Sequence, residues 1–280
     1  MLPPPSLTID STLTTSITPP ATAQPAPSIF ALTGQVAVIT GGAQGLGFAM
    51  AAALCAQDLA GLAILDLNPA IGQQAADALR KTYGTQTSFF KVDITDEAGM
   101  KAVFEQVAET FGGLDIVVSS AGIVDNYPAE QYPVAKFVRL LSINLTGSFI
   151  TAQVAFPYLK ARGGGSIVFV GSMSGHIVNT PQPQSAYNAS KAGVIHLSKS
   201  LAVEWAPHGI RCNSISPGYM ATPLVQHFDT QLVNRWIQAT PLGRMGRPEE
   251  LQGVVVWLAS KASSFTTGAD ISVDGGYTAL

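Results

Sequence analysis

Short apolar runs alternate with longer stretches of helical periodicity from residue 35 to the end of the chain. The apolar runs predict buried strands at residues 35–40, 62–66, 88–92, 116–119, 166–170, 211–214 and 271–273. The stretches between them predict helices at residues 46–59, 69–83, 97–111, 132–159, 186–205 and 249–260, the fourth long enough to bend. Strands that alternate with helices favour parallel pairing, right-handed crossovers and helices on both faces. The pattern therefore predicts an α/β fold with one doubly wound parallel sheet of about seven strands.

The first 28 residues differ in composition from the rest of the chain, which indicates a tail followed by one domain. Residues 1–28 are rich in Pro, Thr, Ser and Ala and contain one charged residue, Asp10. Such a segment buries too little apolar surface to offset its ordering entropy, so we expect a disordered tail whose end, residues 28–32, docks on the domain. Residues 29–280 are expected to form a single domain, with a lid over the ligand site at about residues 219–247.

The composition narrows the class of protein. Hydrophobic residues make up 47% of the chain and charged residues 12%, and the net charge is −3. This balance predicts a large core and lacks the basic footprint of a nucleic-acid binder, and no continuous apolar run approaches the ~18 residues of a membrane span. The first residues lack the regions of a signal peptide, so we expect a cytoplasmic protein. Cys55 and Cys212 have no metal-ligand spacing and are expected to be buried, reduced thiols.

After the first predicted strand, the sequence TGGAQGLG places glycines at positions 41, 45 and 47. Gly41 permits a tight turn, Gly45 lets the backbone approach a pyrophosphate, and Gly47 lets a helix pack closely on the strand. The helix that follows offers free N–H groups and the positive end of its dipole to phosphates. A plain strand-to-helix turn would also fit, but the position between strand and helix favours the dinucleotide fingerprint of a Rossmann-type fold.

Two acidic residues follow the next two predicted strands. Asp66 ends the second strand, where a carboxylate can hydrogen-bond the adenosine ribose and repel a 2′-phosphate. No basic residue occupies positions 44, 67 or 68 to receive such a phosphate, which favours NAD(H) over NADP(H). Asp66 also fits a helix cap, and Asp93, after the third strand, fits either a turn cap or an adenine contact.

Tyr187 and Lys191 have the spacing YxxxK within a predicted helix. Residues at i and i+4 share one helix face, so a phenol lies beside an ammonium group. A free tyrosine has a pKa of about 10, and a nearby cation stabilises the phenolate and lowers that pKa. The pair therefore predicts a general acid and base, a motif that gains weight because it follows a dinucleotide fingerprint.

The fifth predicted strand ends in GSMSG, residues 171–175. A hydroxyl at the carboxyl end of a parallel strand points into the cleft, where it can stabilise a carbonyl oxygen that gains charge. Ser172 and Ser174 both fit this role, and both also fit the capping of N–H groups in the turn.

Together these residues resemble the short-chain dehydrogenase/reductase family over about residues 33–280. The motifs that carry the resemblance are TGGAQGLG, SAG at 120–122, SINLTG at 142–147, GSMSG, YNASK at 187–191, SPGYMATP at 216–223 and DGG at 274–276. Residues 171–211, with the words NTPQPQ and EWA, look like fungal members such as D-arabinitol 2-dehydrogenases, L-sorbose reductases and mannitol 2-dehydrogenases. The resemblance implies an NAD(H)-dependent oxidoreductase that moves hydride between nicotinamide and a secondary alcohol or ketone, such as arabinitol and ribulose.

The resemblance also implies roles for single residues. Tyr187 would be the general acid and base, Lys191 would bind the nicotinamide ribose and lower the tyrosine pKa, and Asn144 would hold a water that relays protons to Lys191. The family's usual spacing before the tyrosine points to Ser174 as the catalytic serine, whereas alignment on the strand end selects Ser172. We expect Ser172, because strand position fixes geometry and loop length does not.

Further cofactor contacts follow from the same resemblance. Tyr219 and Thr222 match positions that contact the nicotinamide amide, and the backbone of Leu46 matches one that contacts the pyrophosphate. Ser120 and Gly122 belong to a segment that usually reads Asn-Ala-Gly in the family. Serine is shorter than asparagine and offers fewer hydrogen bonds, which weakens the case for one bond between the sheet and the cofactor edge.

Three functions are compatible with these motifs. The first is a polyol dehydrogenase or ketose reductase, whose substrate hydroxyls would be bound by His176, Asn179, Gln182, Gln184 and Tyr219. The second keeps the chemistry but reduces a larger ketone of fungal secondary metabolism, in a pocket lined by Leu224, Val225, Phe228 and Trp236, residues that equally fit the packing of a lid helix. The third is a dinucleotide-binding protein without catalysis, which is disfavoured because every catalytic position is filled.

Assembly is the last expectation. The predicted helices around residues 137–155 and 186–205 carry many apolar residues. In relatives the equivalent helices pair across subunits, so the resemblance implies a homotetramer.

Overall fold

In the computed structural model, which describes residues 28–222 and 229–279, seven strands form one sheet. Their order is β3-β2-β1-β4-β5-β6-β7, and every neighbouring pair is parallel. The strand order reverses between β1 and β4, which confirms the doubly wound, Rossmann-type sheet predicted from the sequence. The strands are β1 (Val36–Thr40), β2 (Gly61–Asp66), β3 (Gln86–Lys91), β4 (Ile116–Ser119), β5 (Gly165–Val170), β6 (Ile210–Pro217) and β7 (Asp270–Val273).

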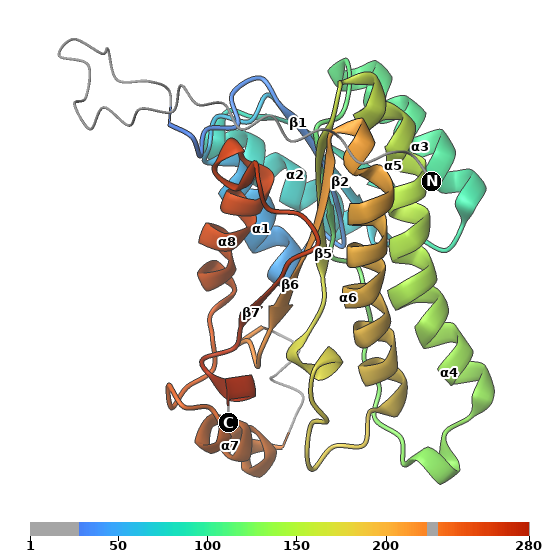
Figure 1. The fold of residues 1–280 in the computed structure, drawn as a ribbon, viewed down its shortest axis with the longest axis vertical. Helices are drawn as coiled ribbons and strands as arrows, with labels where there is room; N and C mark the ends of the chain where they lie inside the picture. Colours follow the sequence, from blue (N-terminus) through green and yellow to red (C-terminus); the bar gives the residue numbers. More distant parts are fainter. Residues whose placement is uncertain (1–27, 223–228, 280) are drawn as a thin grey trace, which may run out of the picture.

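Helices cover both faces of the sheet and make a three-layer molecule (Figure 1). One core cluster joins the sheet to α1 (Gly45–Cys55), α2 (Pro69–Tyr83) and α8 (Gln252–Ala259). The other joins it to α3 (Glu97–Phe111), α5 (Gly147–Ala161) and α6 (Ser185–Trp205). The remaining helices are α4 (Val134–Leu141), which runs into α5, and α7 (Thr230–Ala239), beyond the carboxyl ends of the strands.

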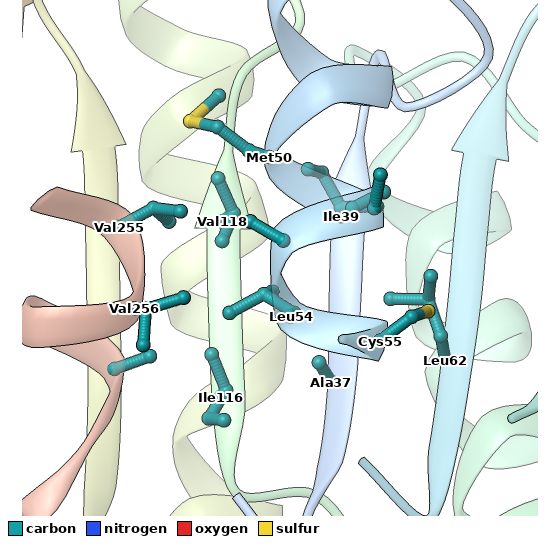
Figure 2. Close-up of a cluster of buried hydrophobic side chains, with 14 of the residues drawn as sticks. Ala37, Ile39, Met50, Leu54, Cys55, Leu62, Ile116, Val118, Val255 and Val256 are labelled. Carbon is teal, nitrogen blue, oxygen red and sulfur yellow. The ribbon is translucent and has the colours of Figure 1, made fainter. Parts of the chain in front are cut away.

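Figure 2 shows how closely the first core is packed. Met50 and Leu54 of α1 lie on the side of Val255 and Val256 of α8, whereas Cys55 lies next to Leu62 of β2. The small residues of α1, mostly Ala, let this helix lie close to β1, and each fully buried Leu or Ile contributes roughly 1.5–3 kcal/mol to folding. The two cysteines are free and buried, as predicted, and burial raises the pKa of Cys55 to about 11 and that of Cys212 to about 12.

Helix ends follow local capping chemistry. The Asn68 side chain accepts hydrogen bonds from the backbone N–H groups of Ala70 and Ile71, and Pro69 occupies the first turn of α2. Asp96 caps α3 in the same way, through the N–H of Gly99. The cap of α2 is therefore Asn68 rather than Asp66, which ends β2.

Two helices differ from their predicted spans. The first ends at Cys55 rather than at residue 59, because Asp58 adopts a left-handed backbone (φ 61°) and Leu59 pairs with Thr33. The predicted long helix is continuous over residues 134–161 but contains a π-helical segment, Ser142–Thr146, between α4 and α5. A single left-handed residue and a single π turn leave the apolar pattern of a whole helix largely intact, so the pattern did not reveal them.

The segment before β1 docks on the domain, as expected. Leu32 is fully buried in the core, and its N–H donates to the carbonyl of Gln57 over 2.9 Å. The carbonyl of Ile29 accepts a hydrogen bond of 3.1 Å from the N–H of Ala262. The predicted tail, residues 1–27, lies outside the described residues.

The helix Val134–Ala161 is long and apolar enough, by length and composition, to cross a membrane. Half of its most apolar window is buried inside the protein. That pattern is the one expected when a helix of a globular fold packs its apolar face on a sheet.

Candidate active site

A cavity of about 990 Å³ opens at the carboxyl ends of the strands, beside the point where the strand order reverses. Every residue predicted to bind the cofactor lines it, namely Gly41, Gly45, Leu46, Gly47, Asp66, Asp93, Ser120, Gly122, Tyr187, Lys191, Tyr219 and Thr222. Ser172 also lines it, and Asn144 lies behind its wall. The fold thus brings residues from eight separate segments to one cleft, where ligands of open parallel sheets bind.

The glycine turn has the geometry that a pyrophosphate needs. A Cβ on Gly47 would lie 2.1 Å from the carbonyl oxygen of Gly41, so only glycine lets α1 begin this close to β1. A Cβ on Gly45 would have nothing within 4 Å, which leaves open space over the turn. The cap residue of α1, Gln44, makes no side-chain hydrogen bond to the first turn, so those N–H groups face the cavity uncapped. The turn therefore fits the phosphates of a dinucleotide.

The two acidic residues lie along the same wall. The carboxylate of Asp66 accepts hydrogen bonds of 3.3 Å from the backbone N–H groups of Ala43 and Asn68, and it is only partly buried. This leaves acceptor positions for ribose hydroxyls. Asp93 accepts bonds from the N–H and the hydroxyl of Thr95, so it caps a turn while lining the cavity.

The segment around Ser120 is held by its backbone. The N–H groups of Ser120 and Ala121 both donate to the hydroxyl of Thr40, over 3.1 and 3.2 Å. Thr40 at the end of β1 thus joins β1 to the turn after β4. The neighbouring Ser119 hydroxyl is the one buried side-chain oxygen or nitrogen without a partner in the described part of the chain.

Ser172 and Tyr187 form the reactive end of the cavity. The Ser172 hydroxyl hydrogen-bonds the Tyr187 side chain, and it also accepts a bond of 3.1 Å from the N–H of Ser174. The Ser174 hydroxyl accepts instead from Gln184. The structure therefore places Ser172, rather than Ser174, against the tyrosine, because β5 ends two residues before it.

Lys191 lies one helical turn beyond Tyr187 and is buried. Its Nζ donates to the carbonyl of Val170 over 2.7 Å and lies 5.6 Å from the centre of the tyrosine ring. Burial lowers the pKa of Lys191 to about 8, so the ammonium group still predominates at neutral pH.

The sequence predicts a lowered pKa for Tyr187, and the protein's own groups do not produce one. Burial raises the pKa of Tyr187, and the hydrogen bond from Ser172 opposes that rise only in part. The main cause is the loss of solvent around the phenolate, which burial imposes. A lowered pKa therefore needs a further positive charge at this end of the cavity.

The Asn144 side chain lies behind the site and hydrogen-bonds two neighbouring segments. Its side chain accepts from the N–H of Ile123 over 2.8 Å and donates to the carbonyl of Ile123 and to the hydroxyl of Ser190, over 2.9 and 3.0 Å. A Cβ on Gly122 would lie 3.2 Å from the Asn144 oxygen and 3.7 Å from Lys191 Nζ. The amide therefore joins the π-helical segment, the turn after β4 and α6.

Amide and aromatic side chains line the cavity next to Ser172 and Tyr187. Asn179, Gln182 and Gln184, predicted as hydroxyl partners, are buried and line the cavity. Tyr219 hydrogen-bonds two of these amides and stacks on Trp236 of α7 at 4.3 Å between ring centres. Its ring therefore faces the substrate side of the cavity.

His176 is a prediction that the structure contradicts. Its Nε2 lies 2.6 Å from Oδ2 of Asp270, on β7, and His176 is not part of the cavity lining. The buried carboxylate of Asp270, which also bonds Ser214 and Ser216, draws the imidazole away from the site.

The cavity contains residues that the sequence did not predict, and the predicted apolar lid residues have different outcomes. Arg139, at the end of α4, and Asn126 line the cavity but follow no local motif that would have revealed them. Trp236 is both a cavity residue and a buried packing residue of α7. Leu224, Val225 and Phe228, the other apolar lid residues, lie outside the described residues.

Comparisons with known proteins agree with this geometry. Residues 41–278 match a family model described as Enoyl-(Acyl carrier protein) reductase. The chain is 41% identical to a probable NADP-dependent mannitol dehydrogenase of Yarrowia lipolytica, over 95% of this chain and 98% of that protein. It is 39% identical to an NADH-dependent L-xylulose reductase of Ambrosiozyma monospora, over 89% of this chain and 97% of that protein.

A solved structure extends the likeness to three dimensions. The crystal structure of a short-chain type dehydrogenase/reductase from Mycobacterium marinum matches with a TM-score of 0.83 and 41% identity, over 90% of this chain and 98% of its own. Both the family model and the relatives cover the glycine turn and the Tyr187–Lys191 pair. The chain therefore belongs to the short-chain dehydrogenase/reductase family, oxidoreductases that act on alcohol and ketone groups with a pyridine nucleotide.

Proposed function

We propose that this chain is an NAD(H)-dependent dehydrogenase/reductase that interconverts a polyol and its ketose, such as arabinitol and ribulose. The observation that carries the proposal is the contact between Ser172 and Tyr187, with Lys191 behind them, in the same cavity as the glycine turn. The names of the relatives from Yarrowia lipolytica and Ambrosiozyma monospora support the polyol/ketose class.

Tyr187, Ser172 and Lys191 each have a separate role in the proposed reaction. A nicotinamide nucleotide held by the glycine turn and Asp66 would supply the hydride acceptor for an alcohol carbon, or the hydride donor for a ketone. The Tyr187 oxygen takes the hydroxyl proton during oxidation and gives it back during reduction, while Ser172 hydrogen-bonds the same substrate oxygen. Lys191 binds the ribose hydroxyls and contributes positive charge. The positive charge of an oxidised nicotinamide in this cavity would add to that of Lys191 and so favour loss of the Tyr187 proton.

We propose NAD(H) as the preferred cofactor. The partly exposed Asp66 carboxylate stands at the carboxyl end of β2, where it would accept ribose hydroxyls and repel a phosphate. The relatives are mixed, since one is named NADP-dependent and another NADH-dependent. The argument therefore rests on this chain's own residues, Asp66 and the uncharged positions 44, 67 and 68.

An activity screen tests both parts of the proposal. Purified full-length protein is assayed with NAD(H) and NADP(H) against arabinitol, sorbitol, mannitol, xylitol and their ketoses, and against a panel of hydrophobic ketones. We expect turnover of at least one polyol/ketose pair, with kcat/KM higher for NAD(H). Turnover of hydrophobic ketones alone would instead support the secondary-metabolite reductase, and preference for NADP(H) would overturn the role of Asp66.

We also propose that the protein is a homotetramer. Val134 and Val138 of α4 and Phe149 of α5 are 76%, 54% and 39% exposed, on the long helix for which the family resemblance implies pairing across subunits. Apolar side chains exposed on one helix face favour association. Light scattering should give four times the mass of the chain, and a monomer would contradict the proposal.

A further inference from the structure

Five side chains next to the reactive end of the cavity form one connected wall, which we call the amide wall: Asn179, Gln182, Gln184, Tyr219 and Trp236. They come from three separate segments, which are the loop before α6, the turn after β6, and α7. All five line the cavity together with Ser172 and Tyr187.

The amides of this wall are buried to a degree that loop amides seldom are. Asn179, Gln182 and Gln184 are 3%, 8% and 8% exposed. Burying an amide is unfavourable unless it is hydrogen-bonded, so such a group is retained where its bonds serve a purpose. Hydrophobic side chains of the same size would fill this space at lower cost.

The hydrogen bonds of the wall fix the direction of each amide. Asn179 Nδ2 and Gln182 Nε2 donate to the Tyr219 hydroxyl, over 3.0 and 2.8 Å. Gln184 Nε2 lies 2.9 Å from Asn179 Oδ1, and Trp236 Nε1 donates to Gln182 Oε1 over 3.2 Å. The Tyr219 hydroxyl also bonds Tyr277, so its oxygen is fully used, and burial raises the Tyr219 pKa to about 12.

These bonds do not use every donor and acceptor position of the amides of Asn179 and Gln182. A primary amide has two N–H donors and a carbonyl oxygen with two acceptor positions. Within the described part of the chain, Asn179 and Gln182 each use one N–H, and Gln182 uses one acceptor position. One N–H of each residue and one acceptor position of Gln182 therefore stay available to a molecule in the cavity.

We propose that the spare N–H groups of Asn179 and Gln182 bind substrate hydroxyls beyond the reacting carbon, which makes Gln182 the main specificity-determining residue for a polyhydroxylated substrate. The inference rests on the proposed function and deepens it. A hydroxyl can accept from an amide N–H and donate to the Gln182 carbonyl at once, which a ketone without hydroxyls cannot do. A site built with buried donors rejects substrates that leave those donors unpaired.

The test compares two substrates in three proteins. The substrates are the best ketose from the activity screen and hydroxyacetone, which keeps a reacting carbonyl but only one hydroxyl. The proteins are the wild type, Gln182→Met, which keeps the volume but not the hydrogen bonds, and Gln252→Met, a matched control whose side chain bonds Ala49 away from the cavity. The wild type is expected to prefer the ketose.

Gln182→Met should lower kcat/KM for the ketose by about 10- to 100-fold and leave hydroxyacetone turnover and NADH affinity within about 3-fold. Asn179→Leu should act in the same direction, and Gln252→Met should change neither substrate. An equal loss for both substrates, or no loss for the ketose, would overturn the inference while leaving hydride transfer intact. Failure of the wild type to reduce any ketose would instead overturn the proposed function, and the inference with it.

Discussion

Backbone atoms form the cavity wall at the end with the glycine turn, whereas side chains form it at the end with the amide wall. Around Gly41 and Gly47 the geometry depends on missing Cβ atoms and on free N–H groups at the start of α1. Around Asn179 and Gln182 it depends on amides and rings that three distant segments bring together. The glycine-turn end can hold a ligand common to a whole family, because backbone atoms do not vary, whereas the amide end can be changed one side chain at a time.

Tyr187→Phe tests the part of the cavity where the two ends meet, because it should remove catalysis without removing NADH binding. The change removes only the hydroxyl that exchanges a proton with substrate, so turnover should fall by about 10³-fold or more. NADH binding should stay within about 2-fold, because the glycine turn and Asp66 are untouched. Steady-state kinetics and NADH fluorescence titration measure the two effects, and retained turnover would contradict the proposed chemistry.

Gly47→Ala should damage the glycine-turn end alone. Its Cβ would lie 2.1 Å from the Gly41 carbonyl oxygen, so the turn must shift and NADH affinity should fall by about 10- to 100-fold. The matched control is Gly253→Ala in α8, whose Cβ meets nothing within 4 Å and which should bind NADH normally. Equal NADH affinity of the two variants would show that close packing of α1 on β1 does not shape the site.

Lys191→Met should expose the stability cost of the buried ammonium group. The pKa of Lys191 is about 8 in the fold and about 10.4 when unfolded, so the unfolded chain binds the extra proton between these values. The penalty is complete below pH 8, shrinks as the pH rises, and is absent above about pH 10.5. Removing the charge therefore gains about 3 kcal/mol at pH 7, less about 1 kcal/mol for the lost bond to Val170.

Denaturant unfolding at pH 7 and pH 10.5 measures this change. The variant should be more stable than the wild type by about 2 kcal/mol at pH 7 and should lose that advantage at pH 10.5. A variant that is destabilised equally at both values would mean that Lys191 is accommodated without a desolvation penalty.

The same contrast explains what the sequence could predict. The seven strands were found because β-branched apolar runs identify buried parallel strands directly. The glycine turn was found because the absence of a Cβ is itself visible in the sequence. The early end of α1 was missed because it depends on the pairing of Leu59 with Thr33, a tertiary contact.

Side-chain networks were predicted least well. Asn179 and Gln182 are among the substrate residues that the sequence predicts, but their bonds to Tyr219 and Trp236 join segments that only the topology brings together. His176 is predicted as a hydroxyl partner too, but it pairs with Asp270, 94 residues away in the sequence, and does not line the cavity. A polar residue in a loop reveals its chemistry only when its partner is known.

The π-helical segment Ser142–Thr146 has a consequence for the insertion and deletion of residues. A π turn accommodates one residue more than an α-helical turn, and each residue of an α-helix advances by about 100°. Deleting one residue here would convert the π turn into a regular α-helical turn and move the Asn144 side chain around the helix axis, so its amide would lose either Ile123 or Ser190. The active site therefore depends on the exact length of this helix as well as on Asn144 within it.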